Sequence, residues 1–205
     1  MALFQGNVGL QSLGDGATNV YARLSRFASL VVDENQGRFY ELASRGKIFS
    51  AANQVAQALS TKSKTATGFI LNNPIGSNVQ VSLLDVCVAL ATAPAGISNI
   101  HLEGNAAQQA VIPTTLTAET VINNQMGNAT TGVANVWNAA TLATAPTVIR
   151  AIGGGPVATG SVNSPYIRDE VAGQLILLPG TLIMLGYVTT AISAVASMAW
   201  TENSL

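Results

Sequence analysis

The chain has 205 residues, of which 48% are hydrophobic and only 9% are charged, far below the usual charged share of about 25%. Its formal net charge is -1, and its basic residues are too sparse to track a phosphate backbone, so we expect no nucleic-acid partner. Charged residues are depleted at the centres of interfaces, so this composition indicates a surface that meets other protein chains. The alternative is a domain with an ordinary uncharged surface.

Residues 1–35 are expected to form an N-terminal arm that is extended or partly helical. The first 22 residues are rich in Gly, Asn and Ser, which favour turns and irregular structure. Four apolar residues of the segment 17–34 recur at spacings of four, three and four, which predicts a short helix: Val20, Leu24, Phe27 and Val31. Residues 30–32 would also suit a strand.

Residues 36–205 are expected to form one β-sandwich domain, because short alternating segments are separated by turn residues. The expected strands are 37–43, 46–51, 67–72, 78–92, 99–105, 146–152, 173–178, 181–188 and 193–202. Residues 53–60 suit a strand or a brief helix, and residues 106–145 suit an irregular excursion with one or two strands. Helices of the length that parallel crossovers need are not indicated. The sequence therefore predicts an all-β, jelly-roll-like β-sandwich that follows the arm.

The segment 78–92 carries the longest strand pattern, with one irregularity. The alternation of apolar residues slips at Leu83 and Leu84, where a β-bulge would re-aim the two faces. Asp85 then interrupts the apolar run, and a buried carboxylate needs a partner. Either Asp85 forms a salt bridge across a subunit interface to a basic residue of 23–64, or the bulge places it in solvent.

Charges are unevenly distributed along the chain. Residues 23–64 hold seven basic and three acidic residues, a sum of +4, whereas residues 65–205 hold two basic and six acidic residues, a sum of -4. The front of the chain could therefore dock on an acidic surface, including the back half of a neighbouring copy. Ordinary solvated charges are the alternative. The candidate interface residues are Arg23, Arg26, Arg38, Arg45, Lys47 and Asp85.

Residues 181–200 carry no charge, and a helix of that length could span a bilayer. The β-branched and aromatic residues of this stretch favour strands instead, and residues 189–193 resemble a turn between two of them. We therefore predict a pair of strands and no membrane partner. A membrane helix remains the alternative.

The sequence contains few candidate catalytic residues. His101 is the only histidine, and it and Glu103 alternate with Ile100 and Leu102, which predicts that they lie on the polar face of a half-buried strand. Cys87 is the only cysteine and lies in an apolar run, which predicts a buried structural thiol. Residues 153–155 are glycines, but they lack the lysine of a phosphate loop. We predict no catalytic, cofactor or metal site and no enzymatic activity.

Two segments carry a resemblance: GFILNNPIGSNVQVSLLDVCVALA and GQLILLPGTLIMLGYVTTAISAVASMAWTE. In the second segment an L-PG-T-L turn leads into an apolar strand, and a final strand ends in Trp200 and Glu202. The pattern, over residues 67–105 and 146–202, resembles the β-sandwich structural proteins of tailed-bacteriophage virions. The resemblance implies a virion protein that is assembled in the host cytoplasm, usually as a homotrimer, and contacts the major capsid protein or other virion proteins. It also implies an arm that reaches over neighbouring subunits.

The leading hypothesis is a non-enzymatic capsid decoration or cement protein that stabilises the shell through contacts between subunits, without a cofactor. The alternative is a fibre or tail module that binds a receptor or a carbohydrate. Such a module needs exposed aromatic residues on loops, and Tyr166 near Arg168 and Asp169 is the candidate. We read residues 168–170 as a solvated or intersubunit turn.

Overall fold

The computed structural model describes residues 38–91, 94–105, 107–113, 118–155 and 166–205. The chain divides into two units, Met1–Tyr40 and Glu41–Leu205, and the fold of the second unit is given below. The predicted arm, its helical face, Arg23 and Arg26 lie outside the described residues. Residues 156–165, which follow the three glycines at 153–155, do so as well.

The described residues contain one short helix, α1 (Tyr40–Ser44), and twelve strands. The strands are β1 (Ile48–Ala52), β2 (Gln57–Ala58), β3 (Thr65–Asn72), β4 (Val79–Leu90), β5 (Ser98–Gly104), β6 (Val111–Pro113), β7 (Ile122–Asn123), β8 (Asn135–Leu142), β9 (Thr147–Gly155), β10 (Tyr166–Leu177), β11 (Leu182–Val188) and β12 (Ser193–Ser204).

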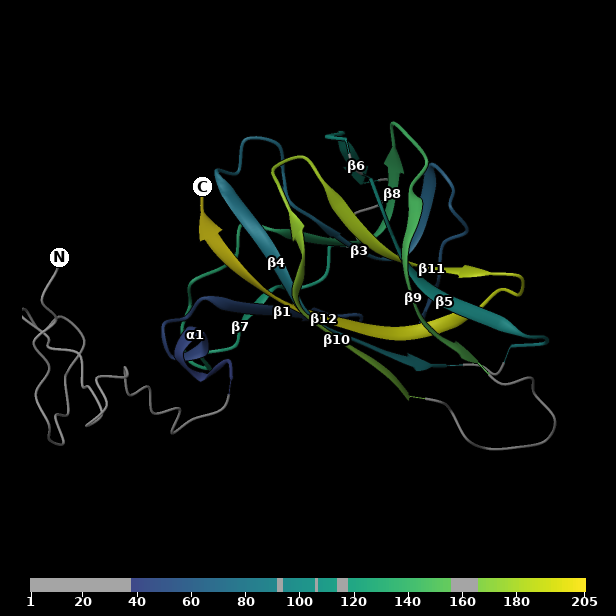
Figure 1. The fold of residues 1–205 in the computed structure, drawn as a ribbon, viewed down its shortest axis with the longest axis horizontal. Helices are drawn as coiled ribbons and strands as arrows, with labels where there is room; N and C mark the ends of the chain where they lie inside the picture. Colours follow the sequence, from purple (N-terminus) through teal and green to yellow (C-terminus); the bar gives the residue numbers. More distant parts are fainter. Residues whose placement is uncertain (1–37, 92–93, 106, 114–117, 156–165) are drawn as a thin grey trace, which may run out of the picture. The chain divides into compact units, whose positions relative to one another are not determined.

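The strands form two antiparallel sheets that pack face to face (Figure 1). The first sheet has the order β10-β4-β12-β1-β7, with β2 beside β12. The second sheet has the order β6-β8-β3-β11-β5-β9. The predicted all-β sandwich is therefore confirmed.

The chain passes repeatedly between the sheets. Strands β3, β4 and β5 lie in the second, first and second sheet, and β9, β10, β11 and β12 alternate in the same way. The predicted pair of strands in residues 181–200 is present as β11 and the first part of β12. The two strands lie in different sheets, however, so the bend at residues 189–192 carries the chain across the sandwich. No helix among the described residues is long and apolar enough to cross a membrane.

The bulge in β4 lies where the alternation of the sequence slips. The pairing of β4 with β12 shifts in register between Leu83 and Asp85, which makes Leu84 the extra residue, and the pairing of β4 with β10 is irregular at the same place. As a result Val81 and Leu83 before the bulge, and Val86 after it, are all fully buried in the core between the sheets. The bulge thus keeps the apolar side of this long strand on the core, as predicted.

Three segments differ from the prediction. Residues 40–44 form a helix instead of a strand. The sequence does not predict this helix because five residues are too few to distinguish helical from strand periodicity. Gly46, with φ of +64°, follows this helix and allows the backbone to reverse. The described residues between 107 and 145 contain three strands instead of one or two, including the regular eight-residue β8. Residues 168–170 lie within β10 instead of in a turn.

Candidate interaction surface and buried polar clusters

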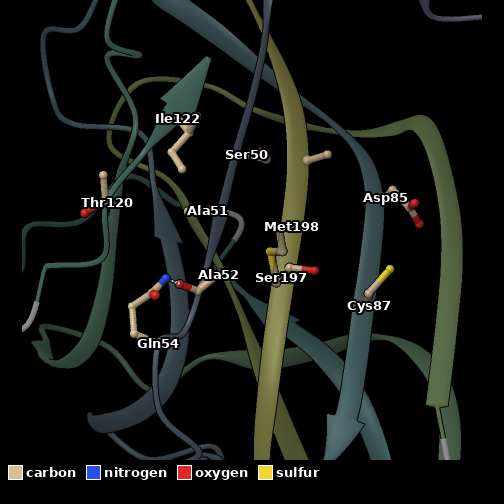
Figure 2. Close-up of a pocket in the computed structure, with 11 residues that line it drawn as sticks. Ser50, Ala51, Ala52, Gln54, Asp85, Cys87, Thr120, Ile122, Ser197 and Met198 are labelled. Atoms are coloured by element: carbon tan, nitrogen blue, oxygen red, sulfur yellow. Dashed lines mark hydrogen bonds between the residues drawn. The ribbon is translucent and has the colours of Figure 1, made fainter. Parts of the chain in front are cut away.

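A shallow hollow lies on the outer face of the first sheet, where β4, β12 and β1 run side by side (Figure 2). Its volume is about 230 Å³. Small side chains contribute much of its lining: Ser50, Ala52, Cys87, Ser197 and Ala199. Ile122 of β7 also lines the hollow and is 47% exposed. We call this feature the β4–β12–β1 hollow.

The hollow follows from the alternation of residues along the strands. In β12 the larger Met198 and Trp200 point into the core and are almost fully buried. Ser197 and Ala199 are half-buried and line the hollow on the opposite face. Because the small outward residues of three neighbouring strands lie together, the surface is lower there than a typical sheet face.

Asp85 is the charged residue that lines the hollow. The bulge at Leu84 places it outside the core, and its Oδ2 accepts a hydrogen bond from Nε of Arg168 at 2.8 Å. This bond, followed by the Coulomb attraction of the same carboxylate, raises the pKa of Arg168 above its ordinary value. The other oxygen, Oδ1, is buried and has no hydrogen-bond partner among the described residues. Asp85 therefore pairs within its own chain and keeps one free acceptor.

Cys87 is half-buried and lines the hollow, so the prediction of a buried thiol is wrong. The hydroxyl of Tyr166 donates a hydrogen bond to its Sγ at 3.1 Å. This bond is the largest cause that raises the pKa of Tyr166 above its ordinary value of 10.0. Tyr166 itself is 64% exposed at the start of β10.

The other candidate interface residues within the described chain lie near the start of the domain. Arg38 stacks over the ring of Phe39 at 5.2 Å, and Arg45 forms an ion pair with Glu41 at 2.6 Å. Lys47 is exposed and directly precedes β1. Asp85 is bonded to Arg168, a residue outside the basic front of the chain. The role of these side chains in an interface stays a prediction.

A second pair of charges joins the two sheets at one edge. Nη2 of Arg150 in β9 donates to Oδ1 of Asp169 in β10 at 2.9 Å, and Nη1 donates to Gln174 at 2.9 Å. Because β9 belongs to the second sheet and β10 to the first, these contacts connect the sheets. Residues 168–170, which the sequence indicated as a turn, are thus part of a strand in which Arg168 and Asp169 are ion-paired with Asp85 and Arg150.

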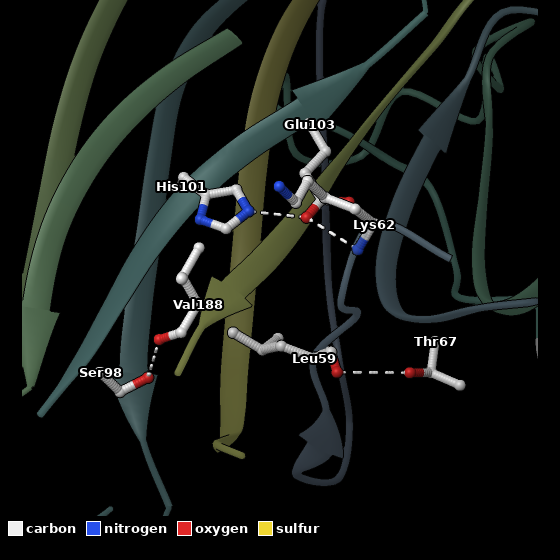
Figure 3. A network of polar contacts seen from close by, with 7 residues as sticks. All are labelled: Leu59, Lys62, Thr67, Ser98, His101, Glu103 and Val188. Carbon is white, nitrogen blue, oxygen red and sulfur yellow. Dashed lines mark hydrogen bonds and ion pairs between the residues drawn. The ribbon is translucent and has the colours of Figure 1, made fainter. Parts of the chain in front are cut away.

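The strongest departure from the sequence prediction is a buried polar cluster on β5 (Figure 3). His101 and Glu103 were expected on the exposed side of a half-buried strand, but their exposed fractions are 2% and 0%. Nε2 of His101 lies 2.6 Å from Oε1 of Glu103. The same oxygen accepts a hydrogen bond from the backbone N–H of Lys62 at 3.2 Å.

Gly186 of β11 makes room for this cluster. A Cβ atom at this residue would overlap both the carboxylate of Glu103 and Nε2 of His101, so only glycine fits here. Beside it, the backbone of Ser60 pairs with β11: the N–H of Tyr187 donates to the carbonyl of Ser60 at 2.9 Å. The cluster thus links β5 and β11 with residues 59–62, the segment that connects β2 in the first sheet to β3 in the second; we call it the crossing segment 59–62.

Glu202 forms a second buried polar cluster near the C-terminal end of β12. Its Oε1 accepts hydrogen bonds from Nε1 of Trp200 and from the N–H of Ala134, both at 3.0 Å. Its Oε2 accepts a bond from the N–H of Val133 at 2.7 Å. The carboxylate therefore holds the chain that leads into β8 against β12. Trp200 is fully buried in the core between the two sheets.

Across the part of the chain that the structure describes, no three His, Cys, Asp or Glu side chains gather as metal ligands would. No family model, no curated protein and no solved structure matches this chain.

Proposed function

We propose that this chain is a non-enzymatic structural protein that assembles with copies of itself, and that it serves as a decoration or cement protein on the capsid of a tailed bacteriophage. The observation that carries the proposal is the strand order of the sandwich. With the β6–β8 excursion and the two-residue β2 set aside, eight strands remain. Numbered in chain order, they give the sheet orders 1-8-3-6 and 2-7-4-5.

These orders match those of a jelly roll, an architecture used in viral capsid and lectin domains. Such a sandwich is rigid, because each long strand is paired within a sheet and covers the same core. Rigidity suits a protein whose task is to hold neighbours together. The strand order alone fits both kinds of domain, so the character of the surface also bears on the choice.

The outer face of the first sheet supports an assembly role. Its central strands present small uncharged side chains, and the carboxylate of Asp85 is ion-paired with Arg168. Large apolar residues on the same sheet are also exposed, with Ile122 at 47% and Val195 at 39%. A face of this kind loses little hydration when another protein covers it.

Under this proposal the chain forms a homotrimer, contacts the major capsid protein or other virion proteins, and resides in the virion after assembly in the host cytoplasm. It would stabilise the shell by binding the assembled state in preference to free subunits. Residues 1–35 would act as the arm that reaches neighbouring subunits.

Sedimentation equilibrium of the full chain in buffer without detergent is the first test. We expect a species of three times 21.0 kDa. A second test is mass spectrometry of particles purified by density gradient from the producing host, in which the chain should be present in many copies. A monomer in solution that is also missing from purified particles would contradict the proposal.

A receptor-binding or carbohydrate-binding module is the second candidate, because Tyr166 is 64% exposed beside the ion pair of Arg168 and Asp85. Exposed aromatic rings next to charged groups can bind sugars by stacking and hydrogen bonding. A glycan array tests this candidate. Binding that is lost in Tyr166→Ala would favour it, and an array without hits would leave the structural role as the better explanation.

A further inference from the structure

We propose that the β4–β12–β1 hollow binds the segment 20–31 of a second copy of this chain. The inference deepens the proposed self-assembly, on which it rests, by naming the surface and the segment that meet. It follows from the shape of the hollow, from a carboxylate oxygen without a partner, and from the pattern of the residues that precede the described domain.

The hollow suits apolar side chains. Its volume of about 230 Å³ is several times the roughly 30 Å³ that one water molecule occupies in the liquid, so it is large enough for a side chain. Small residues line it on β1, β4 and β12, so a large side chain from a partner can approach the sheet closely. The exposed Ile122 borders it on the β7 side and adds apolar contact area.

The segment 20–31 supplies such side chains. Val20, Leu24, Phe27 and Val31 share one face at helical spacing, and Phe27 offers an aromatic anchor. This segment precedes the described residues, which begin at 38. Residues 32–39 connect it to α1, and eight extended residues span up to about 26 Å. That length allows the segment to reach a neighbouring copy.

Charge complementarity determines which residues of the segment 20–31 lie opposite Asp85 in the hollow. Oδ1 of Asp85 is buried in the lining of the hollow and lacks a hydrogen-bond partner among the described residues, while Oδ2 binds Arg168. A buried carboxylate oxygen is stabilised by a donor, most strongly by a charged one. Arg23 and Arg26 flank Leu24 in the sequence and lie three residues apart, so one of them can reach Asp85 when Leu24 and Phe27 fill the hollow.

Cysteine pairing tests the contact directly, because Cys87 in the hollow is the only cysteine of the chain. In the full chain carrying Phe27→Cys, two thiols should form a disulfide and pass their electrons to dissolved oxygen, with copper–phenanthroline as catalyst. The matched control is Ser29→Cys, which lies on the opposite side of the same helical pattern. We expect Phe27→Cys to link to Cys87 at least ten times faster than the control.

Isotope labelling distinguishes a second copy from the same copy. Equal amounts of ¹⁴N and ¹⁵N chains carrying Phe27→Cys are mixed before oxidation, and the peptide that joins residues 27 and 87 is analysed by mass spectrometry. Mixed-isotope peptides support docking between copies. Peptides of single isotope only, or equal rates for Phe27→Cys and Ser29→Cys, overturn the proposal.

A variant that fills the hollow separates this inference from the proposed function. Ala199→Trp should convert the oligomer to a 21.0 kDa monomer, as should deletion of residues 1–35. Ala151→Trp, at an exposed position of β9 in the other sheet, should leave the oligomer unchanged. If the oligomer persists in both the filled and the truncated chain, the docking site is wrong while self-assembly stands. A wild-type chain that is monomeric contradicts self-assembly itself.

Discussion

Nε2 of His101 lies 2.6 Å from Oε1 of Glu103, and both side chains are buried on the same strand, β5. Two residues apart on a strand, they point to the same face of the second sheet. The crossing segment 59–62 contributes the backbone N–H of Lys62 to the same carboxylate. A buried pair of this kind stabilises a fold only while both partners are present, because either one alone is desolvated without compensation.

This dependence can be measured with a double-mutant cycle. His101→Leu leaves the Glu103 carboxylate without its nearest partner, and Glu103→Leu leaves the imidazole alone, so each change should lower the free energy of unfolding by about 3 kcal/mol. The double variant should lose less than the sum of the two, with a coupling of about 1–3 kcal/mol. Urea denaturation of the four proteins gives the values, and simple additivity would show that the two side chains do not interact.

Gly186→Ala should also destabilise the sandwich, by about 1–3 kcal/mol, because the new methyl group would overlap the carboxylate of Glu103. The loss should shrink when Glu103→Ala is introduced first, since the nearer of the two overlapping groups is then removed. Gly96→Ala is the matched control, because a Cβ atom there would meet only one atom, Oγ1 of Thr190, and at a longer distance. Thermal denaturation followed by circular dichroism measures all four changes, and an equal effect of Gly186→Ala in both backgrounds would contradict the explanation.

The bulge of β4 and the buried cluster of β5 show what the sequence can and cannot predict. In β4 the slip of the alternation at Leu84 is local, so the bulge and the outward direction of Asp85 can be read from neighbouring residues. In β5 the alternation predicts correctly that His101 and Glu103 share a face opposite Ile100. It does not reveal that a distant segment packs on that face, because burial there depends on long-range topology.

The same limit explains the pairing of the last two strands. A turn between two apolar strands suggests a hairpin, and residues 181–202 have that pattern. In the structure β11 pairs with β3 and β5, whereas β12 pairs with β1, β2 and β4. Local sequence indicates where a strand begins and ends, but the choice of neighbours is decided by the packing of the whole sandwich. The lining of the β4–β12–β1 hollow, drawn from four strands, was therefore beyond the reach of sequence patterns.

Glu202→Gln should destabilise the protein by about 1–3 kcal/mol, because three N–H donors lose a charged acceptor and meet an amide that also carries a donor. The donors belong to Trp200, Val133 and Ala134. Glu41→Gln is the control: it removes the same charge from an exposed ion pair and should cost less than about 0.5 kcal/mol. Comparable losses of unfolding free energy in the two variants would show that the buried Glu202 carboxylate stabilises the fold no more than an exposed one.

The hydrogen bond from Tyr166 to Cys87 predicts a pH-dependent behaviour on the rim of the hollow. This bond raises the pKa of Tyr166 above 10.0, which means that the folded state favours the neutral phenol. Its contribution to stability is therefore fully present below pH 10.0 and is lost as the pH rises through the raised pKa. Because Tyr166 is exposed and its partner half-buried, the change is local and leaves the sandwich folded.

Carbon-13 labelling of the tyrosine rings allows this titration to be followed by NMR, with Tyr166→Phe to assign the signal. Cys87→Ala removes the largest cause of the shift, so the midpoint of Tyr166 should move down toward 10.0. Ser197→Ala changes another residue of the hollow without touching this hydrogen bond, so it should leave the midpoint in place. If the midpoint is the same in Cys87→Ala and in the unmodified chain, the thiol does not hold the phenol in its neutral form.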